Sequence, residues 1–588
     1  MDFDFTQTPP SLSNQYTNDR VLKSYLKRVL PNAVHSAVEP SLRDLGEIAG
    51  GALYDLQQAD LPNEPTLTQW SAWGERIDRL ETTDVWKRAN TVAAEHGVVA
   101  AAYDAQHGAH SRIHQMALAY LFIPSTDMYG CPLAMTDGAA RTLLDAGNEA
   151  LIEEAVPHFT SRDPASFWTS GQWMTELAGG SDVGKARTTA HRNDDGTWSL
   201  SGRKWFTSAI DAHAAVALAR PEGNDKGGRG LALFYVPIRT ENGLCDGIKV
   251  LRLKDKMGTR KLPTAELHLD GVTAHLVTEE LSNGTRHISP MLNVTRTWNS
   301  VTATAFIRRG MALARSYAQE REAFGEPIIN HPLHQETLAD IQATLEGAFH
   351  LSFRLAELLG RVETGTADDS DKALLRILTP IAKLTTAKQA VSATSEVIEA
   401  FGGAGYVEDT GIPTLHRDAQ VLPIWEGTTN VLALDTLRAL RKLGTIAPLK
   451  AEFQRCIRAV SAPTLAKAIR PAVVAFREAA QWLRKSLGDE ERLQAGARRF
   501  ALTLGRSLEV ALTVRHAQWS LDNEQDGRAA AAAERLAARH VDRVATLDPH
   551  GAYVLVWDFN CPTLFDCHAG EEDAPAEKTE TLASMANV

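Results

Sequence analysis

The sequence predicts an α+β protein in which helical regions precede and follow a central β region. Apolar residues recur at helical spacing from Leu42 to about Pro157 and again from Leu292 onward. Between these regions, short strand-like runs are separated by Gly-rich turns, a pattern typical of a compact antiparallel barrel or sandwich. The length of 588 residues exceeds one ordinary core, so several domains are expected.

The pattern divides the chain into five segments. We expect an N-terminal extended segment, to about residue 40, and a helical domain within residues 1–170, a β domain at 171–288, a helical bundle of four helices at 289–444, an additional helical domain at 445–565, and a disordered tail at 566–588. The tail is acidic and Ala-rich, which disfavours a packed core.

The β region begins with a predicted hairpin over Thr188–Gly202. Its turn, Asn193-Asp194-Asp195-Gly196, contains the Asp-Gly pair that two-strand turns favour. The further strand candidates are Ala214–Arg220, Leu231–Pro237, Gly247–Leu253 and Thr264–Leu269.

The later helices are predicted from apolar stripes. Trp298, Val301, Ala305 and Phe306 share one helical face. Two long helices are expected over 333–359 and 373–400, separated by a polar loop. Beyond residue 440, two further stripes consist of Ile469, Val473, Phe476, Ala480, Leu483 and Leu487, and of Phe500, Leu504, Leu508 and Leu512.

The composition, with 44% hydrophobic and 23% charged residues, indicates an ordinary globular protein. The net charge of -12 gives no global attraction to nucleic acid, although residues 445–545 hold 17 Lys and Arg against 11 Asp and Glu.

Five scattered cysteines argue against a disulfide framework and favour a reducing compartment. No signal, transit or peroxisomal pattern and no membrane-spanning run is seen, so a cytoplasmic location is expected. Cys561, Cys567 and His568 have a poor zinc spacing, and no metal site is predicted.

The segment Ile424-Trp425-Glu426-Gly427-Thr428-Thr429-Asn430 carries the strongest chemical signal. It places one carboxylate between an apolar, aromatic flank and a flexible turn. A carboxylate there would be poorly hydrated, which suits a general base. Taken alone, the segment favours a surface Glu before a turn, and the motifs upstream reverse that preference in favour of the base.

Five motifs occur in a characteristic order. They are Met174-Thr175-Glu176-Leu177-Ala178-Gly179-Gly180-Ser181-Asp182, Lys204-Trp205-Phe206-Thr207-Ser208, Arg321-Glu322-Ala323-Phe324-Gly325, Phe401-Gly402-Gly403-Ala404-Gly405-Tyr406 and Trp425-Glu426-Gly427-Thr428. Together they resemble the acyl-CoA dehydrogenase family of flavoproteins over roughly residues 90–440. Leu253-Lys254-Asp255-Lys256-Met257-Gly258, the Trp before Glu426 and the C-terminal extension look most like the AidB branch.

The resemblance implies FAD as cofactor and FAD-dependent α,β-dehydrogenation of an acyl-CoA thioester, with Glu426 as catalytic base and flavin N5 as hydride acceptor. Arg296 matches an arginine that shapes the acyl-CoA site. The implied FAD contacts are Thr175, Ser181, Trp205, Thr207, Arg321, Phe324, Gln335, Gly402, Gly403, Thr428 and Asn430. On a regular strand, Trp205 and Thr207 would point to the same side.

In this family FAD bridges subunits, with Arg321, Phe324 and Gln335 reaching a neighbour's cofactor. The resemblance therefore implies a homo-oligomer, most simply a homotetramer, with electron-transfer flavoprotein or a similar acceptor as redox partner. Two alternatives stay open. One is an acyl-CoA oxidase that passes electrons to oxygen.

The other alternative is an AidB-like flavoprotein with a DNA-binding or protective role and little turnover. Its phosphate-contacting residues would be Arg498, Arg499, Arg506, Arg515, Arg528, Arg535, Arg539 and Arg543. The interspersed acidic residues favour a plainer role for the same arginines, as a solvated helix surface or an intersubunit salt-bridge layer.

Overall fold

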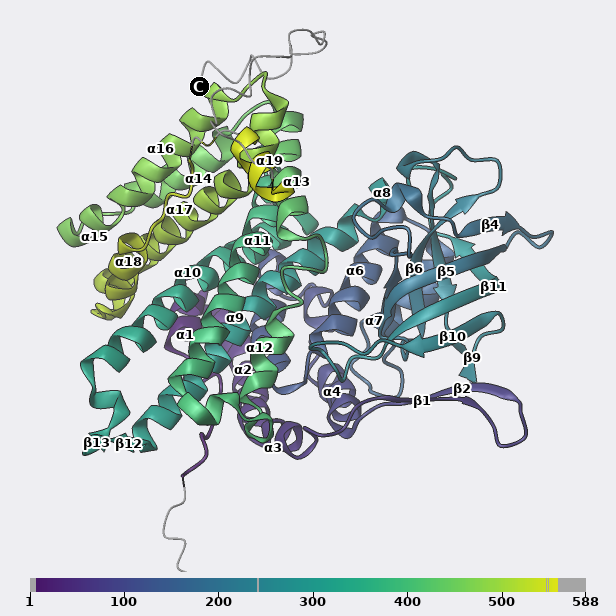
Figure 1. Ribbon diagram of the computed structural model, residues 1–588, viewed down its shortest axis with the longest axis horizontal. Coiled ribbons are helices and arrows are strands. Elements are labelled where there is room, and N and C mark those ends of the chain that lie inside the picture. The colour runs from purple at the N-terminus through teal and green to yellow at the C-terminus, as the bar shows by residue number, and fades with distance from the viewer. Residues whose placement is uncertain (1–6, 241–242, 546, 548, 559–588) are drawn as a thin grey trace, which may run out of the picture. The chain divides into compact units, whose positions relative to one another are not determined.

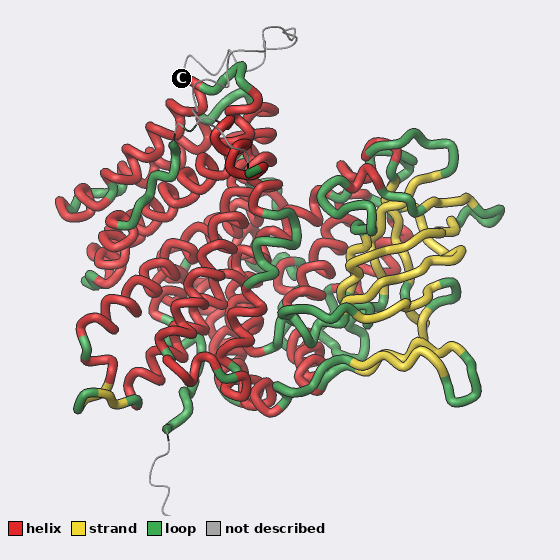
Figure 2. The backbone as a smooth tube through the Cα atoms, viewed as in Figure 1, coloured by secondary structure: helices red, strands yellow, loops and turns green. Residues whose placement is uncertain are grey.

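The computed structural model describes residues 7–240, 243–545, 547 and 549–558 (Figure 1). Helices precede and follow a set of strands along the chain, which confirms the predicted order (Figure 2). The chain forms two compact units. One comprises Met1–Ile341, Leu359–Gly365 and Ala387–Glu426, and the other Gln342–Leu358, Thr366–Thr386 and Gly427–Val588. The predicted tail and the Cys561, Cys567 and His568 cluster lie outside the described residues.

The first unit begins with helices, including in the segment that the sequence pattern predicts to be extended. These helices are α1 (Arg20–Val29), α2 (Asn32–Gly50), α3 (Ala52–Ala59), α4 (Asp84–Glu95), α5 (Ser111–Phe122), α6 (Gly130–Ala146) and α7 (Glu149–Phe159). The extended prediction is wrong from Arg20 because Asp19 caps α1 by accepting a hydrogen bond from Leu22 N at 2.8 Å. Val21, Leu22, Tyr25 and Leu26 are buried along one side of this helix.

A β-hairpin interrupts these helices and was not predicted. Its strands β1 (Thr66–Trp70) and β2 (Arg76–Glu81) pair in antiparallel fashion. The hairpin is attached to a distant strand, because Gln69 Nε2 donates to Val250 O at 2.8 Å and Val250 N donates to Asp78 Oδ2 at 3.0 Å.

The β domain is a closed ring of strands with one strand added at each side. The strands of this sheet are β3 (Ser170–Trp173), β4 (Thr189–Arg192), β5 (Trp198–Ser208), β6 (Ala214–Pro221), β7 (Ala232–Pro237), β10 (Ile248–Leu253) and β11 (Thr264–Leu276). The ring closes because β7 pairs with both β6 and β11, and the path between them runs through β4 and β5. The predicted strands and the Asp-Gly turn are confirmed. The pairing is not wholly antiparallel, since β6 runs parallel to β3 and β4. A small hairpin joins β8 (Arg239–Thr240) and β9 (Gly243–Leu244).

The β domain is followed by α8 (Gly284–His287), the 32-residue α9 (Ser289–Glu320), a short hairpin of β12 (Glu322–Ala323) and β13 (Glu326–Pro327), α10 (Pro332–Glu363), α11 (Asp369–Ala400), α12 (Ile412–Ala419) and α13 (Thr429–Leu443). The predicted apolar face of α9 is buried. Both α10 and α11 contribute residues to both units.

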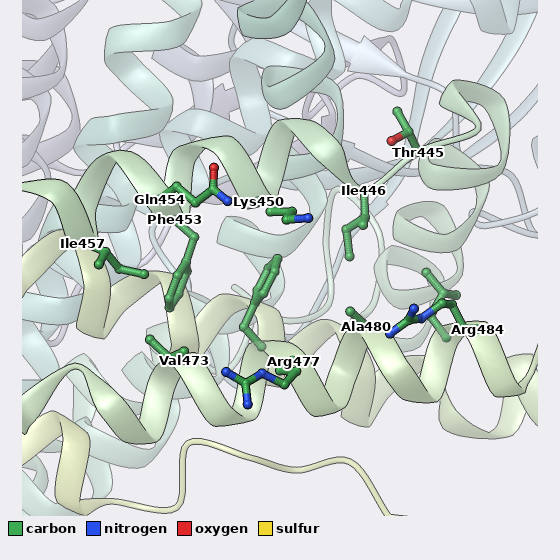
Figure 3. Close-up of a pocket in the computed structure, with 12 residues that line it drawn as sticks. Thr445, Ile446, Lys450, Phe453, Gln454, Ile457, Val473, Arg477, Ala480 and Arg484 are labelled. Carbon is green, nitrogen blue, oxygen red and sulfur yellow. The ribbon is translucent and has the colours of Figure 1, made fainter. Parts of the chain in front are cut away.

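The second unit contains the C-terminal helices α14 (Ala447–Arg458), α15 (Pro463–Ala468), α16 (Arg470–Lys485), α17 (Glu490–Glu524), α18 (Arg528–Ala538) and α19 (Pro549–Trp557). Both predicted stripes contribute buried side chains, on α16 and α17. Leu384, Leu432 and Ala433 pack with Ala497 and Ala501 in its core. A cavity of about 370 Å³ lies between α14 and α16 (Figure 3).

Within the described ranges, no helix combines the length and apolar character required to cross a membrane.

Candidate active site

Glu426 occupies a turn in which its backbone is strained. Its φ is 56°, in the left-handed region that side chains other than those of Gly, Asn and Asp rarely adopt. Gly427 follows with φ 103°. Strained residues of this kind persist where the surrounding structure holds them, and they cluster at functional sites. The conformation therefore supports the choice of Glu426 among the acidic residues.

Helix α9 holds Glu426 at both its side chain and its backbone. Thr295 Oγ1 donates to Glu426 Oε2 at 2.7 Å, and Arg296 Nε donates to Glu426 O at 3.2 Å. The preceding segment is also attached, because Asn299 Nδ2 donates to Leu422 O at 3.1 Å. Thr295 is buried, so its hydroxyl has little access to competing water. The carboxylate is thus oriented by a neutral donor and keeps its second oxygen for other contacts.

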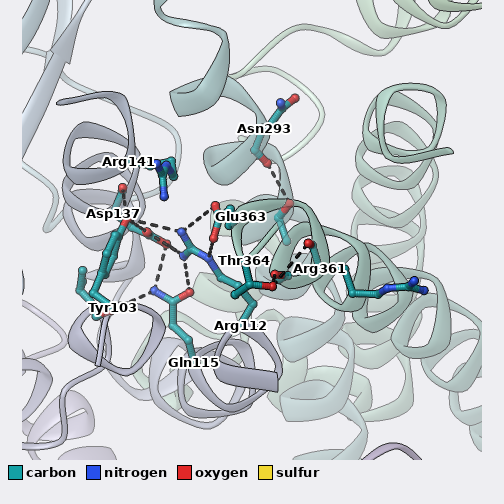
Figure 4. A network of polar contacts seen from close by, with 12 residues as sticks. Tyr103, Arg112, Gln115, Asp137, Arg141, Asn293, Arg361, Glu363 and Thr364 are labelled. Atoms are coloured by element: carbon teal, nitrogen blue, oxygen red, sulfur yellow. Dashed lines mark hydrogen bonds and ion pairs between the residues drawn. The ribbon is translucent and has the colours of Figure 1, made fainter. Parts of the chain in front are cut away.

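A buried polar network fixes α9 itself (Figure 4). Asp137 on α6 accepts hydrogen bonds from Arg112 Nη1 at 2.7 Å and from Trp298 Nε1 at 2.7 Å. Tyr103 Oη donates to the same carboxylate at 2.6 Å, while Arg112 Nη2 donates to Glu363 Oε1 at 2.9 Å. Trp298 is one turn of α9 away from Thr295, so the network sets the position of the residues that hold Glu426.

Cys131 and Lys256 influence each other's ionisation, and the Glu426 carboxylate also influences that of Cys131. Burial raises the pKa of the Cys131 thiol, an effect that the Lys256 ammonium opposes and the Glu426 carboxylate increases. The thiol is therefore neutral, which does not suit a nucleophile. Burial lowers the pKa of Lys256 to about 8. Its Nζ donates to Leu262 O at 2.6 Å and to Thr264 Oγ1 at 3.0 Å.

The loop from Thr175 to Ser181 is anchored by a buried ion pair. Lys204 Nζ donates to Glu176 Oε1 at 2.9 Å and to Leu218 O at 2.7 Å. Burial opposes ionisation of Glu176, but Lys204 and further hydrogen bonds lower the pKa of this carboxyl. Thr175 is half-buried and Ser181 is exposed. The backbone of Thr175 also holds the loop, since Thr175 O accepts a hydrogen bond from Trp205 N at 3.0 Å, whereas the hydroxyls of Thr175 and Ser181 take no part in the ion pair.

Strand β5 carries a bulge at the second predicted flavin motif. Lys204 pairs with Leu267 and Thr207 with Ala265, so two residues of β5 face the single intervening residue of β11. Thr207 is buried, and its Oγ1 donates to Ala265 O at 2.7 Å. Trp205 is half-buried. The bulge interrupts the alternation that would place Trp205 and Thr207 on one side, so that argument does not hold. Their contact with flavin stays a prediction.

The Arg321–Gly325 motif forms the hairpin of β12 and β13. Phe324 and Gly325 make its turn, with φ 54° and 92°. The Phe324 side chain is 99% exposed, which is unusual for an aromatic residue in a strained turn. Arg321 is half-buried, and Gln335 is exposed with its Nε2 donating to Ile329 O at 2.9 Å. The hairpin therefore presents an aromatic ring that the described part of the chain leaves uncovered.

The glycine motif at residues 401–406 contains exposed backbone, just as the hairpin exposes the Phe324 ring. Gly402 and Gly403 are exposed, and a Cβ added to either would meet no atom within 4 Å. The adjacent Phe401 stacks on Tyr317, with ring centroids 4.5 Å apart, so the loop is anchored to α9. Its backbone is accessible to a large ligand.

Thr428 and Asn430 have contacts of their own in the second unit. Thr428 is the N-cap of α13 and accepts a hydrogen bond from Val431 N at 3.4 Å. Asn430 Oδ1 accepts from Arg498 Nη1 at 3.4 Å. Both are exposed, and their contact with FAD stays a prediction.

Several arginines of the proposed DNA face are engaged within the second unit. Arg528 Nη1 pairs with Glu346 Oε1 at 2.5 Å, and Arg539 Nη1 donates to Thr344 Oγ1 at 2.7 Å. Arg506 Nη1 donates to His540 O at 3.2 Å, and burial lowers the pKa of Arg506. These contacts favour an internal polar layer over a continuous phosphate-binding face.

Three residues at the site were not singled out by the sequence. Thr295 belongs to the segment that contains Arg296, but nothing in that segment indicates a contact with a residue 131 positions away. Glu176 and Lys204 lie inside the quoted motifs. The first flavin motif carries the acidic Glu176 and the second carries the basic Lys204. Their opposite charges are the signal that would have predicted an ion pair between the motifs. Among the described residues, no group of three or more His, Cys, Asp and Glu side chains is arranged to hold a metal ion.

A carboxylate held at a strained turn, within the helix–barrel–helix order, fits the class that the sequence motifs indicate, an oxidoreductase that acts on CH–CH donors. Comparison with known proteins agrees. The chain matches the models for the adaptive response protein AidB N-terminal domain at residues 7–164, the acyl-CoA dehydrogenase middle domain at 171–272 and the acyl-CoA dehydrogenase C-terminal domain at 282–440.

Individual relatives identify the branch of the family that the chain resembles. It is 42% identical over 542 residues to acyl-CoA dehydrogenase family member 11 of Caenorhabditis elegans, covering 89% of this chain and 87% of the relative. It is 32% identical to the putative acyl-CoA dehydrogenase AidB of Escherichia coli, covering 66% of this chain and 72% of the relative. The crystal structure of C. elegans ACDH-11 in complex with C11-CoA superimposes with a TM-score of 0.90 at 38% identity, over 95% of this chain and 97% of that one. The protein therefore belongs to the acyl-CoA dehydrogenase family and is similar to its AidB branch, and the predicted fold is confirmed.

Proposed function

We propose that Glu426 is the base of an FAD-dependent α,β-dehydrogenation of an acyl-CoA thioester. Dehydrogenation of acyl-CoA is the general activity of the family, and the assignment to Glu426 rests on one observation. This carboxylate sits on a left-handed turn with its side chain held by Thr295 and its carbonyl held by Arg296. The arrangement supports a positioned base because it orients the carboxylate without neutralising it by an ion pair.

The chain's own groups can activate the substrate and accept its proton. In the described part of the chain, the Glu426 N–H donates to no protein acceptor, so it is available to the thioester carbonyl. A hydrogen bond there would acidify the neighbouring α-C–H. Thr295 engages Oε2, which leaves Oε1 to take the α-proton. When bound, FAD supplies the acceptor for the hydride that leaves the β-carbon.

The residues fit FAD on two observations. The loop that contains Thr175 and Ser181 is anchored through the ion pair of Glu176 with Lys204, which leaves the side-chain hydroxyls of Thr175 and Ser181 available. The backbone around Gly402 and Gly403 is open, as close approach of a phosphate group requires. With Trp205 and Thr207, the loop would hold the flavin ring.

The exposed hairpin supports binding of FAD across subunits. Phe324 is uncovered by its own subunit, and Arg321 and Gln335 lie on the same chain segment. A neighbouring subunit's cofactor would cover the ring, which makes a homo-oligomer, most simply a tetramer, necessary for function.

The acyl chain length of the substrate and the identity of the electron acceptor are also part of the proposal. The C. elegans relative was crystallised with C11-CoA, which favours an acyl chain of intermediate length for this protein. Electron-transfer flavoprotein is the proposed acceptor. An oxidase would instead produce peroxide under air, so a peroxide assay separates the two.

The first test is an anaerobic titration of the FAD-loaded protein with acyl-CoAs of increasing length, followed by flavin absorbance. We expect bleaching with a limited range of chain lengths. A flavin that stays oxidised with every thioester would contradict the dehydrogenase assignment. It would favour the AidB-like alternative, whose DNA binding should weaken steeply with added salt.

A further inference from the structure

The cavity between α14 and α16 has no role in the proposed reaction. We propose that it binds the anion of a fatty acid, with the alkyl chain inside and the carboxylate at its basic rim. Its volume of about 370 Å³ is in the range of small-molecule sites, which span roughly 300 to 1,000 Å³. We call it the α14–α16 pocket, and Figure 3 shows the residues that line it.

The interior of the α14–α16 pocket is apolar. Phe453 of α14 and Phe476 of α16 stack with ring centroids 5.0 Å apart. Ile446, Val473 and Leu483 are also among its lining residues. Val473 belongs to the apolar stripe of α16 but is only half-buried, because it faces the cavity. An occupant that covered these side chains would remove apolar surface from water.

Three cations surround this apolar interior. Lys450 projects from α14, and Arg477 and Arg484 project from α16 (Figure 3). All three are exposed. None of them pairs with a carboxylate of the described residues, and no acidic residue lines the pocket. By contrast, the neighbouring Arg455 pairs with Glu452. Within the described ranges, the rim therefore carries positive charge that no carboxylate pairs with.

Apolar walls with a basic rim fit an amphipathic anion. A neutral lipid would not use the cations, and a nucleic acid would not fill the apolar interior. A carboxylate accepts charge-assisted hydrogen bonds from Lys and, in bidentate fashion, from Arg. A linear alkyl chain suits a gap bordered by two helices. A fatty acid anion satisfies both requirements within one small molecule.

The test uses the full-length, FAD-loaded protein, with a saturating enoyl-CoA present to block the catalytic acyl site. Decanoate and decanol are titrated separately by calorimetry. We expect the double variant Lys450→Ala/Arg484→Ala to weaken decanoate binding by at least about tenfold, as expected from loss of charge-assisted hydrogen bonds. Decanol binding should change by less than about twofold, because the apolar wall is intact. Added salt should weaken decanoate binding alone.

Two further variants make the result specific. Arg458→Ala removes an exposed cation from α14 that does not line the pocket, and it should leave decanoate binding unchanged. Ala480→Trp should fill the pocket and abolish binding of both probes. Flavin reduction by acyl-CoA should be unchanged in all variants. Equal decanoate affinity in the wild type and the double variant would overturn the proposal. So would the absence of decanoate binding to the wild type. If Ala480→Trp also dissociated the oligomer, this face would be identified as a subunit contact.

Discussion

Replacement of Glu426 by Gln tests the proposed chemistry most directly. Gln keeps the length of the side chain, and Thr295 Oγ1, now 2.7 Å from Oε2, can donate to the amide oxygen instead. The hydrogen bond from Arg296 to the backbone carbonyl is unaffected, so the strained turn should persist. What is lost is the group that accepts the α-proton. Loss of a general base costs about 10²- to 10⁴-fold in rate, or about 2.7 to 5.5 kcal/mol in the barrier.

The assay is stopped-flow flavin reduction under anaerobic conditions, with FAD content measured by absorbance before mixing. Glu426→Gln should retain FAD and reduce it at least about 10²-fold more slowly. Glu408→Gln is the matched control, because Glu408 is an exposed carboxylate whose partner is Arg417. A Glu426→Gln rate within about threefold of the wild type would refute the assignment of Glu426 as base.

Four further outcomes follow from contacts described above. Thr295→Val should slow flavin reduction by about 10- to 100-fold, because it deletes a hydrogen bond to a carboxylate; Thr295→Ser should retain most activity, and an equally active Val variant would remove Thr295 from the site. Asp137→Asn should lower the free energy of unfolding in urea by about 3 to 5 kcal/mol, because it leaves a buried arginine less compensated; a loss below about 1 kcal/mol would contradict the role of the network. Phe324→Ala should weaken both FAD retention and the oligomer in sedimentation experiments without lowering the unfolding free energy, whereas Phe324→Tyr should not; an intact oligomer with full FAD in the Ala variant would count against the hairpin. Burial opposes ionisation of Glu452, but two arginines lower its pKa to about 2. This depressed pKa contributes stability that is present above its ordinary value of 4.5 and is lost as the pH falls toward 2. Glu452→Gln should therefore flatten the loss of stability between pH 4.5 and 2, and an unchanged acid profile would contradict this.

The sequence predicts the strands and the long helices well because their patterns are local. The Asp194-Asp195-Gly196 turn and the stripe of α9 are examples. The hairpin of β1 and β2 could not be predicted in the same way, since its strands are largely exposed and have no buried face. It is held by contacts with Val250, more than 170 residues away. Tertiary contacts of this range leave no local trace.

The candidate site shows the same division. The choice of Glu426 follows from motifs that are contiguous in the chain, whereas the turn at Phe324 was not predicted. The contact of Thr295 with Glu426 depends on how α9 lies beside the turn, which only the three-dimensional structure reveals. The bulge in β5 depends on the register of its pairing with β11, which the residues Lys204 to Thr207 do not predict by themselves.

The buried pair of Glu176 and Lys204 constrains how the protein can change over time. Replacing either residue alone would strand an uncompensated charge where water cannot reach it, at a cost of about 3 to 5 kcal/mol. Exchange of both for apolar residues would remove both charges together, but it requires two substitutions at once and takes away the acceptor of Arg187 N and Thr188 N. A lineage carrying this pair therefore has no easy single-step route away from it, although neither side chain is proposed to touch substrate.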